Sequence, residues 1–318
     1  MILLLWAATG VLFAQPDPSG SPQTVYTGLY LMNVYDLNMN EHSFHADFYL
    51  WFRWTGDKDP MQIEFVNAVE KWSITQTVFY DSAVVLPDGS YYNGMRIEGR
   101  FYHPFVLNRF PLDRHQLQIQ IEHTDYPADS LRFVPDTARS LYRPDMQLPG
   151  WKVQHAEVQM VDNRYQTDFG RADEGMRAFS EITFRLRLAR PLSYFLLKLM
   201  LPLTVVVLAS LGAFLITPSY IDARISLPIA GLLSAVFLQQ SYSAALPDVG
   251  YMVLMDKIYL LSYVLIAGML MRIIISSNQA RLAPEEASLA RILRRDLRLG
   301  FLFFGVYMLI WLALVLGG

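Results

Sequence analysis

The sequence predicts a β + α membrane protein, in which an antiparallel β-sandwich is followed by a bundle of four membrane-spanning helices. The first half of the chain alternates apolar and polar residues with a period of two, which is typical of strands with one buried face. The last third contains apolar runs of the ~20 residues that cross a bilayer core. Hydrophobic residues make up 53% of the chain against 17% charged residues, and their concentration in that last third favours a membrane protein with a large polar head.

The chain starts with a short apolar run, Met1 to Ala14, which ends in Leu-Phe-Ala before Gln-Pro-Asp-Pro. Such a run resembles the apolar core and cleavage site of a secretory signal peptide, although no basic residue precedes it. We therefore expect residues 1–14 to be a signal peptide and residues 15–190 to be exported. The sequence has no cysteine, so the exported domain has to be held by its core and by assembly instead of disulfides.

Three segments of the exported half show the strand pattern most clearly: residues 48–54, 117–122 and 182–188. Turn-forming sequences, such as Pro-Asp-Gly at 87–89, separate the strands at spacings that suit antiparallel pairing. The domain over 15–190 is therefore expected to be an immunoglobulin-like β-sandwich. Pro191 ends its last strand, because proline cannot donate to a strand ladder, and the membrane domain begins there.

Residues 191–318 form the predicted membrane domain. Charge-free runs indicate three of its spans. The remaining span, third along the chain, carries Asp256 and Lys257 near its start and Arg272 near its end, from where long side chains reach the membrane interface. The four helices are expected at about 192–216, 222–245, 251–277 and 297–316. Residues 278–296 are expected to be a short, arginine-rich loop.

Loop charges orient these helices. The predicted loop 278–296 holds arginines at 281, 291, 294 and 295, whereas the loop after the second helix holds Asp248 and no basic residue. By the positive-inside rule, the arginine-rich loop is cytoplasmic. Four spans then return the C-terminus to the side of the β-domain. We therefore expect a multi-pass protein of the cell (inner) membrane, with the N-terminal domain and the C-terminus extracellular or periplasmic.

The second predicted helix keeps small and polar residues on one face. On a period of 3.6 residues, one stripe consists of Asp222, Ser226, Ala230, Leu233, Phe237 and Gln240. A helix with such a face is unsuited to lipid all round, so the stripe is predicted to line a pore. Rings of Leu233 and Phe237 would close a narrow pore by excluding water, and the alternative for them is ordinary helix packing. Pro228 removes one backbone hydrogen bond early in the helix and is either a hinge or merely tolerated there.

Other function classes find little support. The net charge of −3, with no basic cluster in the exported half, argues against nucleic-acid binding. The sequence has no nucleophile elbow, glycine-rich phosphate loop or metal motif, so we expect neither an enzyme nor a bound cofactor or metal. All six histidines lie in the exported half and, because histidine titrates near neutral pH, they make modulation by pH a hypothesis. They are His42, His45, His103, His115, His123 and His155.

Short motifs then narrow the function. Phe110-Pro111-Leu112-Asp113 resembles the FPxD element at the tip of a loop between two sandwich strands in pentameric ligand-gated ion channels, the Cys-loop receptor superfamily. Two cysteines close that loop in animal members, whereas Leu117 stands here at the position of the second. This departure resembles the prokaryotic branch, and the chain looks most like the bacterial channels gated by amines or protons. Further matching motifs, in order, are Trp54-Thr55-Gly56, Leu86-Pro87-Asp88-Gly89, Arg190-Pro191, Leu201-Pro202-Leu203 and Leu246-Pro247.

The resemblance implies a homopentamer in the lipid bilayer, in which this chain and four further copies surround a pore lined by the second helix. Fivefold symmetry turns each pore residue into a ring. A ring of Asp222 carboxylates at the cytoplasmic mouth would concentrate monovalent cations, so cation selectivity is expected. Asp222 also suits a helix N-cap, and Ala223-Arg224 resembles anion-selective relatives, which usually have proline where Asp222 stands. A non-conducting membrane-anchored sensor is the alternative from another class, and it predicts a second span without a polar stripe.

The resemblance also implies a small-molecule agonist between neighbouring exported domains, where an amine would need aromatic faces and a carboxylate. The candidates are Glu122, His123, Thr124, Tyr126, Tyr165 and Phe179 on one side, and Tyr49, Trp51 and Arg53 on the other. Thr124 stands where amine-gated relatives carry an aromatic residue, which argues against an amine. Coupling between the domains is expected through Phe110, Pro111, Asp113, Arg190, Pro247 and Asp248. Asp113 and Arg190 carry opposite charges that could pair near the junction, although a pair at the surface alone would contribute little energy.

Overall fold

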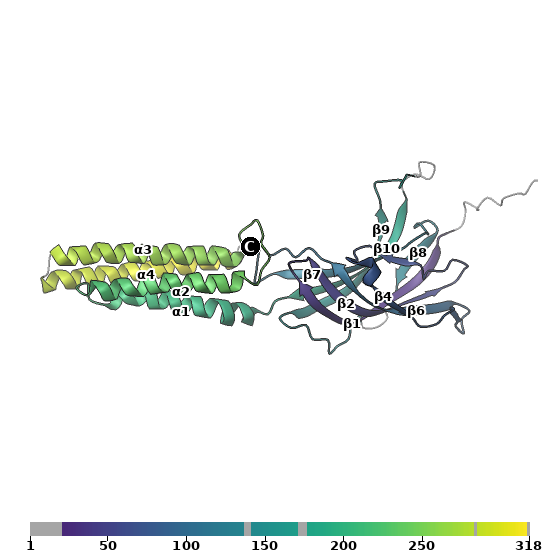
Figure 1. The fold of residues 1–318 in the computed structure, drawn as a ribbon, viewed down its shortest axis with the longest axis horizontal. Coiled ribbons are helices and arrows are strands. Elements are labelled where there is room, and N and C mark those ends of the chain that lie inside the picture. Colours follow the sequence, from purple (N-terminus) through teal and green to yellow (C-terminus); the bar gives the residue numbers. More distant parts are fainter. Residues whose placement is uncertain (1–20, 137–140, 171–176, 283–284, 317–318) are drawn as a thin grey trace, which may run out of the picture.

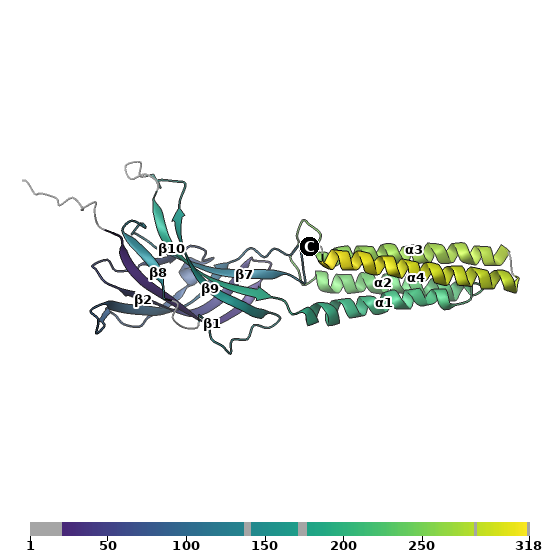
Figure 2. The same cartoon turned by 180° about the vertical axis from the view of Figure 1, so that it is seen from behind.

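The structure, a computed structural model, describes residues 21–136, 141–170, 177–282 and 285–316, and the signal peptide expected at 1–14 lies outside these ranges. Figure 1 shows an elongated molecule with the strands at one end and the long helices, side by side, at the other. The C-terminal end of α4 (Glu286–Leu316) lies at the boundary between the two parts, as Figures 1 and 2 both show. The β-domain and the helical domain therefore meet at one junction.

Two sheets make up the β-domain. The first has the order β4-β6-β2-β1-β8, with β5 against β6, and the second has the order β3-β7-β10-β9. Their strands are β1 (Gln23–Asn38), β2 (Ser43–Trp54), β3 (Ile63–Phe65), β4 (Thr75–Val78), β5 (Val84–Val85), β6 (Tyr91–Tyr102), β7 (Arg114–His123), β8 (Leu131–Pro135), β9 (Lys152–Arg164) and β10 (Ala178–Ala189). A 3₁₀ turn, η1 (Lys71–Ser73), lies between β3 and β4. All pairings are antiparallel except that of β1 with β8.

The core of the sandwich comes from the alternation seen in the sequence. Phe48, Leu50 and Phe52 of β2 are fully buried, whereas Tyr49 and Trp51, which alternate with them, are partly exposed. Ile119 of β7 and Phe184 of β10 supply the facing layer in the second sheet. Each such buried side chain stabilises the fold by roughly 1.5–3 kcal/mol. The predicted β-sandwich is confirmed, and the three segments with the clearest alternation lie in β2, β7 and β10.

Among the described residues, four helical segments are long and apolar enough to cross a membrane. The first, Tyr194–Leu215, consists of a π-helical segment η2 (Tyr194–Met200), α1 (Leu201–Leu211) and a 3₁₀ turn η3 (Gly212–Leu215). The others are α2 (Ile221–Ser243), α3 (Leu254–Leu282) and α4. Pro202 has no N–H to donate to the preceding turn, in agreement with the change from π to α geometry at that point.

Most of the loop expected at 278–296 is helical, namely residues 278–282 and 286–296. α3 continues to Leu282, and α4 begins at Glu286 instead of about residue 297. Arginine, leucine and alanine are good helix formers, so this stretch continues the helices although it is charged. Arg291, Arg294 and Arg295 lie exposed on α4. The first turns of α4 therefore extend the helix with a charged face.

Small residues bring α1 and α2 together. Gly231 of α2 is buried against Ser210 of α1, and a Cβ atom at position 231 would collide with the Ser210 Oγ. That hydroxyl is itself held in place, because it donates to the Val206 carbonyl at 2.9 Å. The close approach of the two helices thus requires glycine at this position.

Candidate pore face, agonist site and domain junction

The predicted pore stripe is an exposed face of α2. All six of its residues are exposed in the single chain: Asp222, Ser226, Ala230, Leu233, Phe237 and Gln240. Leu233 is 57% exposed and Phe237 is 66% exposed, so packing within the chain does not account for either side chain. The buried face of α2 carries Arg224, Pro228, Gly231, Ala235 and Tyr242 instead. The stripe therefore points away from the bundle of its own chain.

Asp222 lies in the first turn of α2 but is not its N-cap. The helix begins at Ile221, and the capping position is Tyr220, which makes no side-chain capping bond. Among the described residues, the exposed Asp222 carboxylate has no hydrogen-bond or ion-pair partner. The helix dipole still favours a negative charge at this end. The carboxylate is thus left free at the end of the exposed stripe.

Arg224 points the opposite way and is fully buried. Its Nε donates to the Ala213 carbonyl at 3.2 Å, and its Nη1 donates to the Ser276 Oγ at 3.1 Å. Its Nη2 lies 2.6 Å from Oδ2 of Asp296, whose Oδ1 lies 2.6 Å from Nη2 of Arg272. The buried cluster Arg224–Asp296–Arg272 therefore ties the start of α2 to α3 and α4, and it keeps this guanidinium away from the exposed stripe.

Sequence reasoning missed Asp296. A signal was nevertheless present, since Asp296 is the one acidic residue among the arginines of 291–298. It lies at helical spacing from Gly300 and Tyr307, the other buried residues of α4. A carboxylate on the buried side of a helix implies a buried cationic partner. The signal was lost because this stretch was expected to be a loop.

The loop between β6 and β7, residues 103–113, meets the membrane helices. Three hydrogen bonds make this contact: Leu107 N–H to Tyr251 Oη (3.0 Å), Leu254 N–H to the Asn108 carbonyl (3.0 Å) and Arg109 Nη2 to the Val315 carbonyl (3.1 Å). Phe110 stacks on Tyr242 of α2, with ring centroids 6.3 Å apart and planes at 18°. The loop is thus in direct contact with the helix that carries the pore stripe, and with its neighbours.

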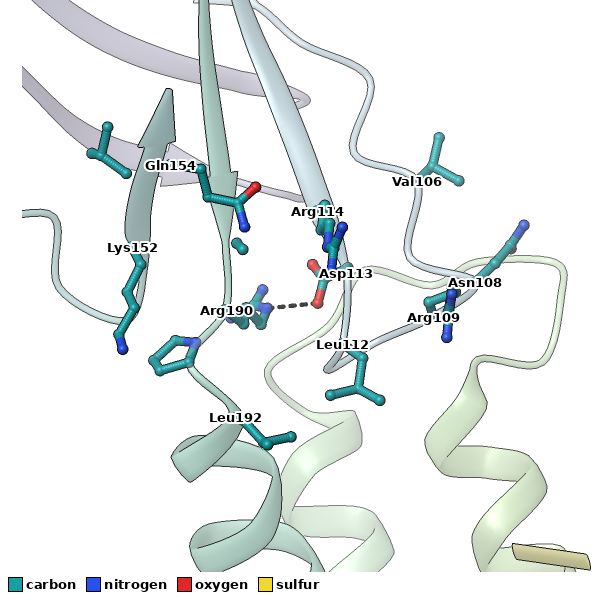
Figure 3. A pocket seen from close by; sticks show the side chains of 13 residues that line it. Val106, Asn108, Arg109, Leu112, Asp113, Arg114, Lys152, Gln154, Arg190 and Leu192 are labelled. Atoms are coloured by element: carbon teal, nitrogen blue, oxygen red, sulfur yellow. Dashed lines mark hydrogen bonds and ion pairs between the residues drawn. The ribbon is translucent and has the colours of Figure 1, made fainter. Parts of the chain in front are cut away.

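Asp113 and Arg190 are paired, but not at the surface. Figure 3 shows the pair between the end of β10 and the start of β7, with Arg190 Nε 2.8 Å from Asp113 Oδ1 and both side chains largely buried. The other oxygen, Oδ2, lies 2.7 Å from His115 Nε2. The Arg190 guanidinium lies over the rings of Trp151, at 4.2 Å, and Phe110, at 5.0 Å. The two charges therefore pair near the junction, and the pair is buried because these rings cover the guanidinium.

A second buried imidazole adjoins this pair. His103 Nε2 lies 3.5 Å from His115 Nδ1, and the two rings pack edge to face with Phe105. Burial, with a smaller contribution from His115 and His42, lowers the pKa of His103 to about 4. His103 is therefore neutral at neutral pH.

Pro247 and Asp248 lie in the loop after α2, and Asp248 has no hydrogen-bond or ion-pair partner among the described residues.

The agonist candidates of β7 and the β9–β10 hairpin come together around Glu122. Its carboxylate accepts hydrogen bonds from Asn163 Nδ2 at 2.7 Å and Tyr165 Oη at 3.0 Å. The Tyr165 ring packs against Phe179 and Phe169, at centroid distances of 6.0 and 5.3 Å. Burial raises the pKa of Glu122, although its two donors oppose this shift. The result is a buried carboxylate beside aromatic faces. Asn163 and Phe169 belong to this cluster, but the sequence analysis did not predict them.

His123 is held as a structural group. Its Nε2 lies 3.0 Å from the Asp59 carbonyl, and its Nδ1 accepts from the backbone N–H groups of Asp125 and Tyr126, each at 3.0 Å. These contacts define the neutral imidazole, and burial lowers the pKa of His123. Tyr126 packs on this ring at 4.6 Å, whereas Thr124 is exposed. This part of the candidate set therefore shapes the turn after β7.

The remaining agonist candidates, Tyr49, Trp51 and Arg53, lie on β2 in the other sheet. Each has a local partner: Tyr49 with Arg96 (5.6 Å), Trp51 Nε1 with Asp136 Oδ2 (3.2 Å) and Arg53 with the Tyr26 ring (5.1 Å). The chain does not bring them to the Glu122 cluster.

Within the described ranges, no group of three His, Cys, Asp or Glu residues is arranged to hold a metal ion.

The chain is similar to a proton-gated ion channel of Gloeobacter violaceus, with 24% identity over 339 residues that cover 95% of this chain and 90% of that protein. It is also similar to the glycine receptor subunit beta of Rattus norvegicus, 24% identical over 67% of this chain and 42% of that subunit. The gamma-aminobutyric acid receptor subunit pi of Bos taurus is 20% identical over 78% of this chain and 59% of that subunit. The chain thus spans less than two thirds of these animal subunits. No protein-family model matches it.

Proposed function

We propose that the chain belongs to the pentameric Cys-loop receptor superfamily, close to its bacterial channels, and that it forms a cation-selective, ligand-gated ion channel. Five copies would surround a pore lined by α2 in the cell membrane, with the β-domain on the extracellular or periplasmic side. The four apolar helices and the similarity over 90% of a bacterial channel support this assignment. Fivefold symmetry would turn the exposed stripe of α2 into successive rings.

The observation that carries cation selectivity is the opposite orientation of two charges at the start of α2. Asp222 is exposed and unpaired among the described residues, whereas Arg224 is buried against Asp296. A ring of Asp222 carboxylates would therefore set a negative potential at the cytoplasmic mouth. The anion-selective alternative rests on the resemblance of Ala223-Arg224 to anion-selective relatives, and the burial of Arg224 against Asp296 argues against a positive ring there. A non-conducting sensor would leave the exposed polar stripe without a role.

The test is a measurement of reversal potentials under a NaCl gradient, with purified protein in planar bilayers and current elicited by acid steps or a panel of small amines. We expect the current of the native protein to reverse near the sodium equilibrium potential. Asp222→Asn is expected to move the reversal potential towards zero. Glu286→Gln, which removes an exposed carboxylate from the same end of the bundle, serves as the matched control.

Each outcome of this experiment has a distinct meaning. A native current that reverses at the chloride potential overturns cation selectivity. Equal shifts from Asp222→Asn and Glu286→Gln would assign the effect to surface charge in general and not to a ring in the pore. Absence of current under every stimulus, from protein that is shown to be folded and pentameric, would favour the sensor.

For the agonist, we propose a small molecule with a cationic group that binds at a subunit boundary beside Glu122, Tyr165 and Phe179. A buried carboxylate with aromatic neighbours favours a cation through charge and cation–π contact. The second candidate is the proton, which the raised pKa of Glu122 favours. Thr124 still argues against an amine of the kind that binds an aromatic residue at that position.

Glu122→Gln separates the two agonist candidates, because glutamine keeps the acceptor oxygen for Tyr165 but cannot be ionised. If a cation is the agonist, the half-activating concentration of the active compound rises at least tenfold while acid has no effect of its own. If the proton acts here, the variant loses its acid response. An unchanged response to both stimuli would remove Glu122 from the site. Phe169→Leu tests the aromatic wall without altering charge.

A further inference from the structure

The sulfur of Met39 lies against the Arg190 guanidinium at the domain junction. Arg190 Nη2 donates to Met39 Sδ at 3.3 Å, while Nε of the same guanidinium lies 2.8 Å from Asp113 Oδ1. A thioether sulfur is a weak acceptor, whereas a carboxylate oxygen is a strong one. Within the described ranges, no oxygen atom accepts from this Nη2. One nitrogen of a largely buried cation therefore has a weaker acceptor than its charge favours.

Met39 belongs to the short turn between β1 and β2, and polar side chains fix this turn. Asn38 Oδ1 accepts hydrogen bonds from the backbone N–H groups of Asn40 and Glu41, each at 3.1 Å. The Glu41 carboxylate is paired with Arg100 of β6. The backbone around Met39 is thus held to its own sheet, and the Met39 side chain extends from that turn to the guanidinium at the end of β10.

A small solute can reach this contact. Met39 is only partly buried. On the other side, Arg190 and Asp113 line a cavity of about 810 Å³, which Figure 3 shows between the β6–β7 loop and the start of β9. The sequence has no cysteine, so its sulfur atoms are those of methionine. Methionine reacts with peroxides to give a sulfoxide, and dedicated reductases reverse this oxidation.

We propose that Met39 is a site of reversible oxidation by a peroxide, and that its sulfoxide binds Arg190 more strongly than the thioether does. The sulfur attacks one oxygen of hydrogen peroxide, so that an S–O bond forms and the O–O bond breaks. The sulfur loses two electrons, and the other oxygen leaves as water with both protons. The sulfoxide oxygen carries a large negative partial charge, which suits a guanidinium N–H. The unbranched methionine side chain is flexible enough to place that oxygen at hydrogen-bond distance from Nη2.

Oxidation would change how the two domains are held together. Arg190 already binds the β6–β7 loop through Asp113, and its guanidinium lies over the Trp151 ring beside β9. A sulfoxide at position 39 would bind the β1–β2 turn to the same cation as well. The end of β10, from which the first membrane segment starts, would then be tied more firmly to the β-domain. The proposal goes beyond the channel function proposed above and does not depend on it.

The experiment treats the purified full-length protein in detergent with limiting hydrogen peroxide. Mass spectrometry of its peptides measures the sulfoxide at each methionine, and tryptophan fluorescence gives the melting temperature. The comparison is with Met39→Leu, which keeps an apolar side chain of similar size but has no sulfur. We expect Met39 to be oxidised, and the peroxide-induced change in melting temperature to be about 3–6 °C more positive in the parent protein than in Met39→Leu. Treatment with a methionine sulfoxide reductase should remove this difference.

Met252→Leu is the matched control. Met252 is 46% exposed in the loop between α2 and α3, and its sulfur has no polar contact among the described residues. This variant should respond to peroxide as the parent protein does. The proposal is overturned if Met39 stays reduced at a dose that oxidises Met252. It is also overturned if the parent protein and Met39→Leu respond alike, or if Met252→Leu loses the response to the same extent as Met39→Leu. Because no current is measured, each of these results leaves the proposed channel function untouched.

Discussion

Replacement of Asp296 by asparagine is the sharpest test of the buried charge cluster at the end of the helices far from the β-domain. The Asp296 side chain is fully buried, and guanidinium nitrogens of Arg224 and Arg272 lie 2.6 Å from its two oxygens. Asparagine keeps the size of the side chain but turns one acceptor oxygen into a donor that faces a cation. Loss of one partner of a buried ion pair costs about 3–5 kcal/mol. Because this carboxylate serves two cations, we expect the upper end of that range, about 5 kcal/mol per subunit.

The measurement is the apparent melting temperature of the purified protein, followed by tryptophan fluorescence. A loss of 1 kcal/mol lowers the melting temperature of a chain of this size by about 2–4 °C, so Asp296→Asn should lower it by about 10–20 °C. The triple variant Arg224→Met/Asp296→Leu/Arg272→Met replaces the whole cluster with apolar side chains of similar volume. It should recover most of the loss, since no buried charge is then left unpaired.

Glu286→Gln provides the control, because it neutralises an exposed carboxylate on the same helix. It should leave the melting temperature within about 1–2 °C. Melting of Asp296→Asn at the temperature of the control would contradict a stabilising role for the buried charges. A triple variant no more stable than Asp296→Asn would do the same, since the loss would then come from packing and not from charge.

Two other sites give expectations of the same kind. Burial lowers the pKa of His103 from 6.5 to about 4, so between these values the unfolded chain binds a proton that the folded chain does not. Stability should therefore fall as the pH drops from about 6.5 to 4, by on the order of 3 kcal/mol per subunit, and stay level below that. Melting temperatures of His103→Phe between pH 4 and 8 should lose this slope, and retention of the full slope contradicts the assignment. Gly231→Ala should destabilise the packing of α1 on α2 by about 1–3 kcal/mol, because its Cβ meets the Ser210 Oγ. Ser210→Ala should rescue that variant, and Gly268→Ala, where a Cβ meets open space within α3, should be neutral or stabilising by up to about 1 kcal/mol. Equal melting temperatures of the Gly231→Ala and Gly268→Ala variants would contradict the close approach.

The features that the sequence predicted best are those carried by neighbouring residues. Alternation within β2, β7 and β10 and the apolar runs of the four helices are local patterns, and they were sufficient for the fold class. The ends of the helices were harder, because the arginines near the end of α3 and in the first turns of α4 change the hydropathy of the chain without ending either helix. Hydropathy indicates where an apolar span ends, but it does not indicate where the helix ends.

The candidate sites divide in the same way. The stripe of α2 followed from the helical period alone, and its residues are exposed together. The burial of Asp113 could not be predicted, because it depends on Arg190 and Trp151, which come from distant parts of the chain. Asp296 is a similar case, since its partners lie on two other helices. Pairings over such sequence separations leave no periodic signal.

The hydrogen bond from Arg109 to the Val315 carbonyl joins residues 206 positions apart, and it sets an order on the biosynthesis of the molecule. Translation at about 5–20 residues per second delivers residue 315 roughly 10–40 s after residue 109. The β-domain emerges first, so its two sheets can form during that interval. Its core runs on into the helices at the junction, and the β6–β7 loop still waits for its last partner. A nascent chain stalled before α4 would therefore carry a folded head on an unfinished junction.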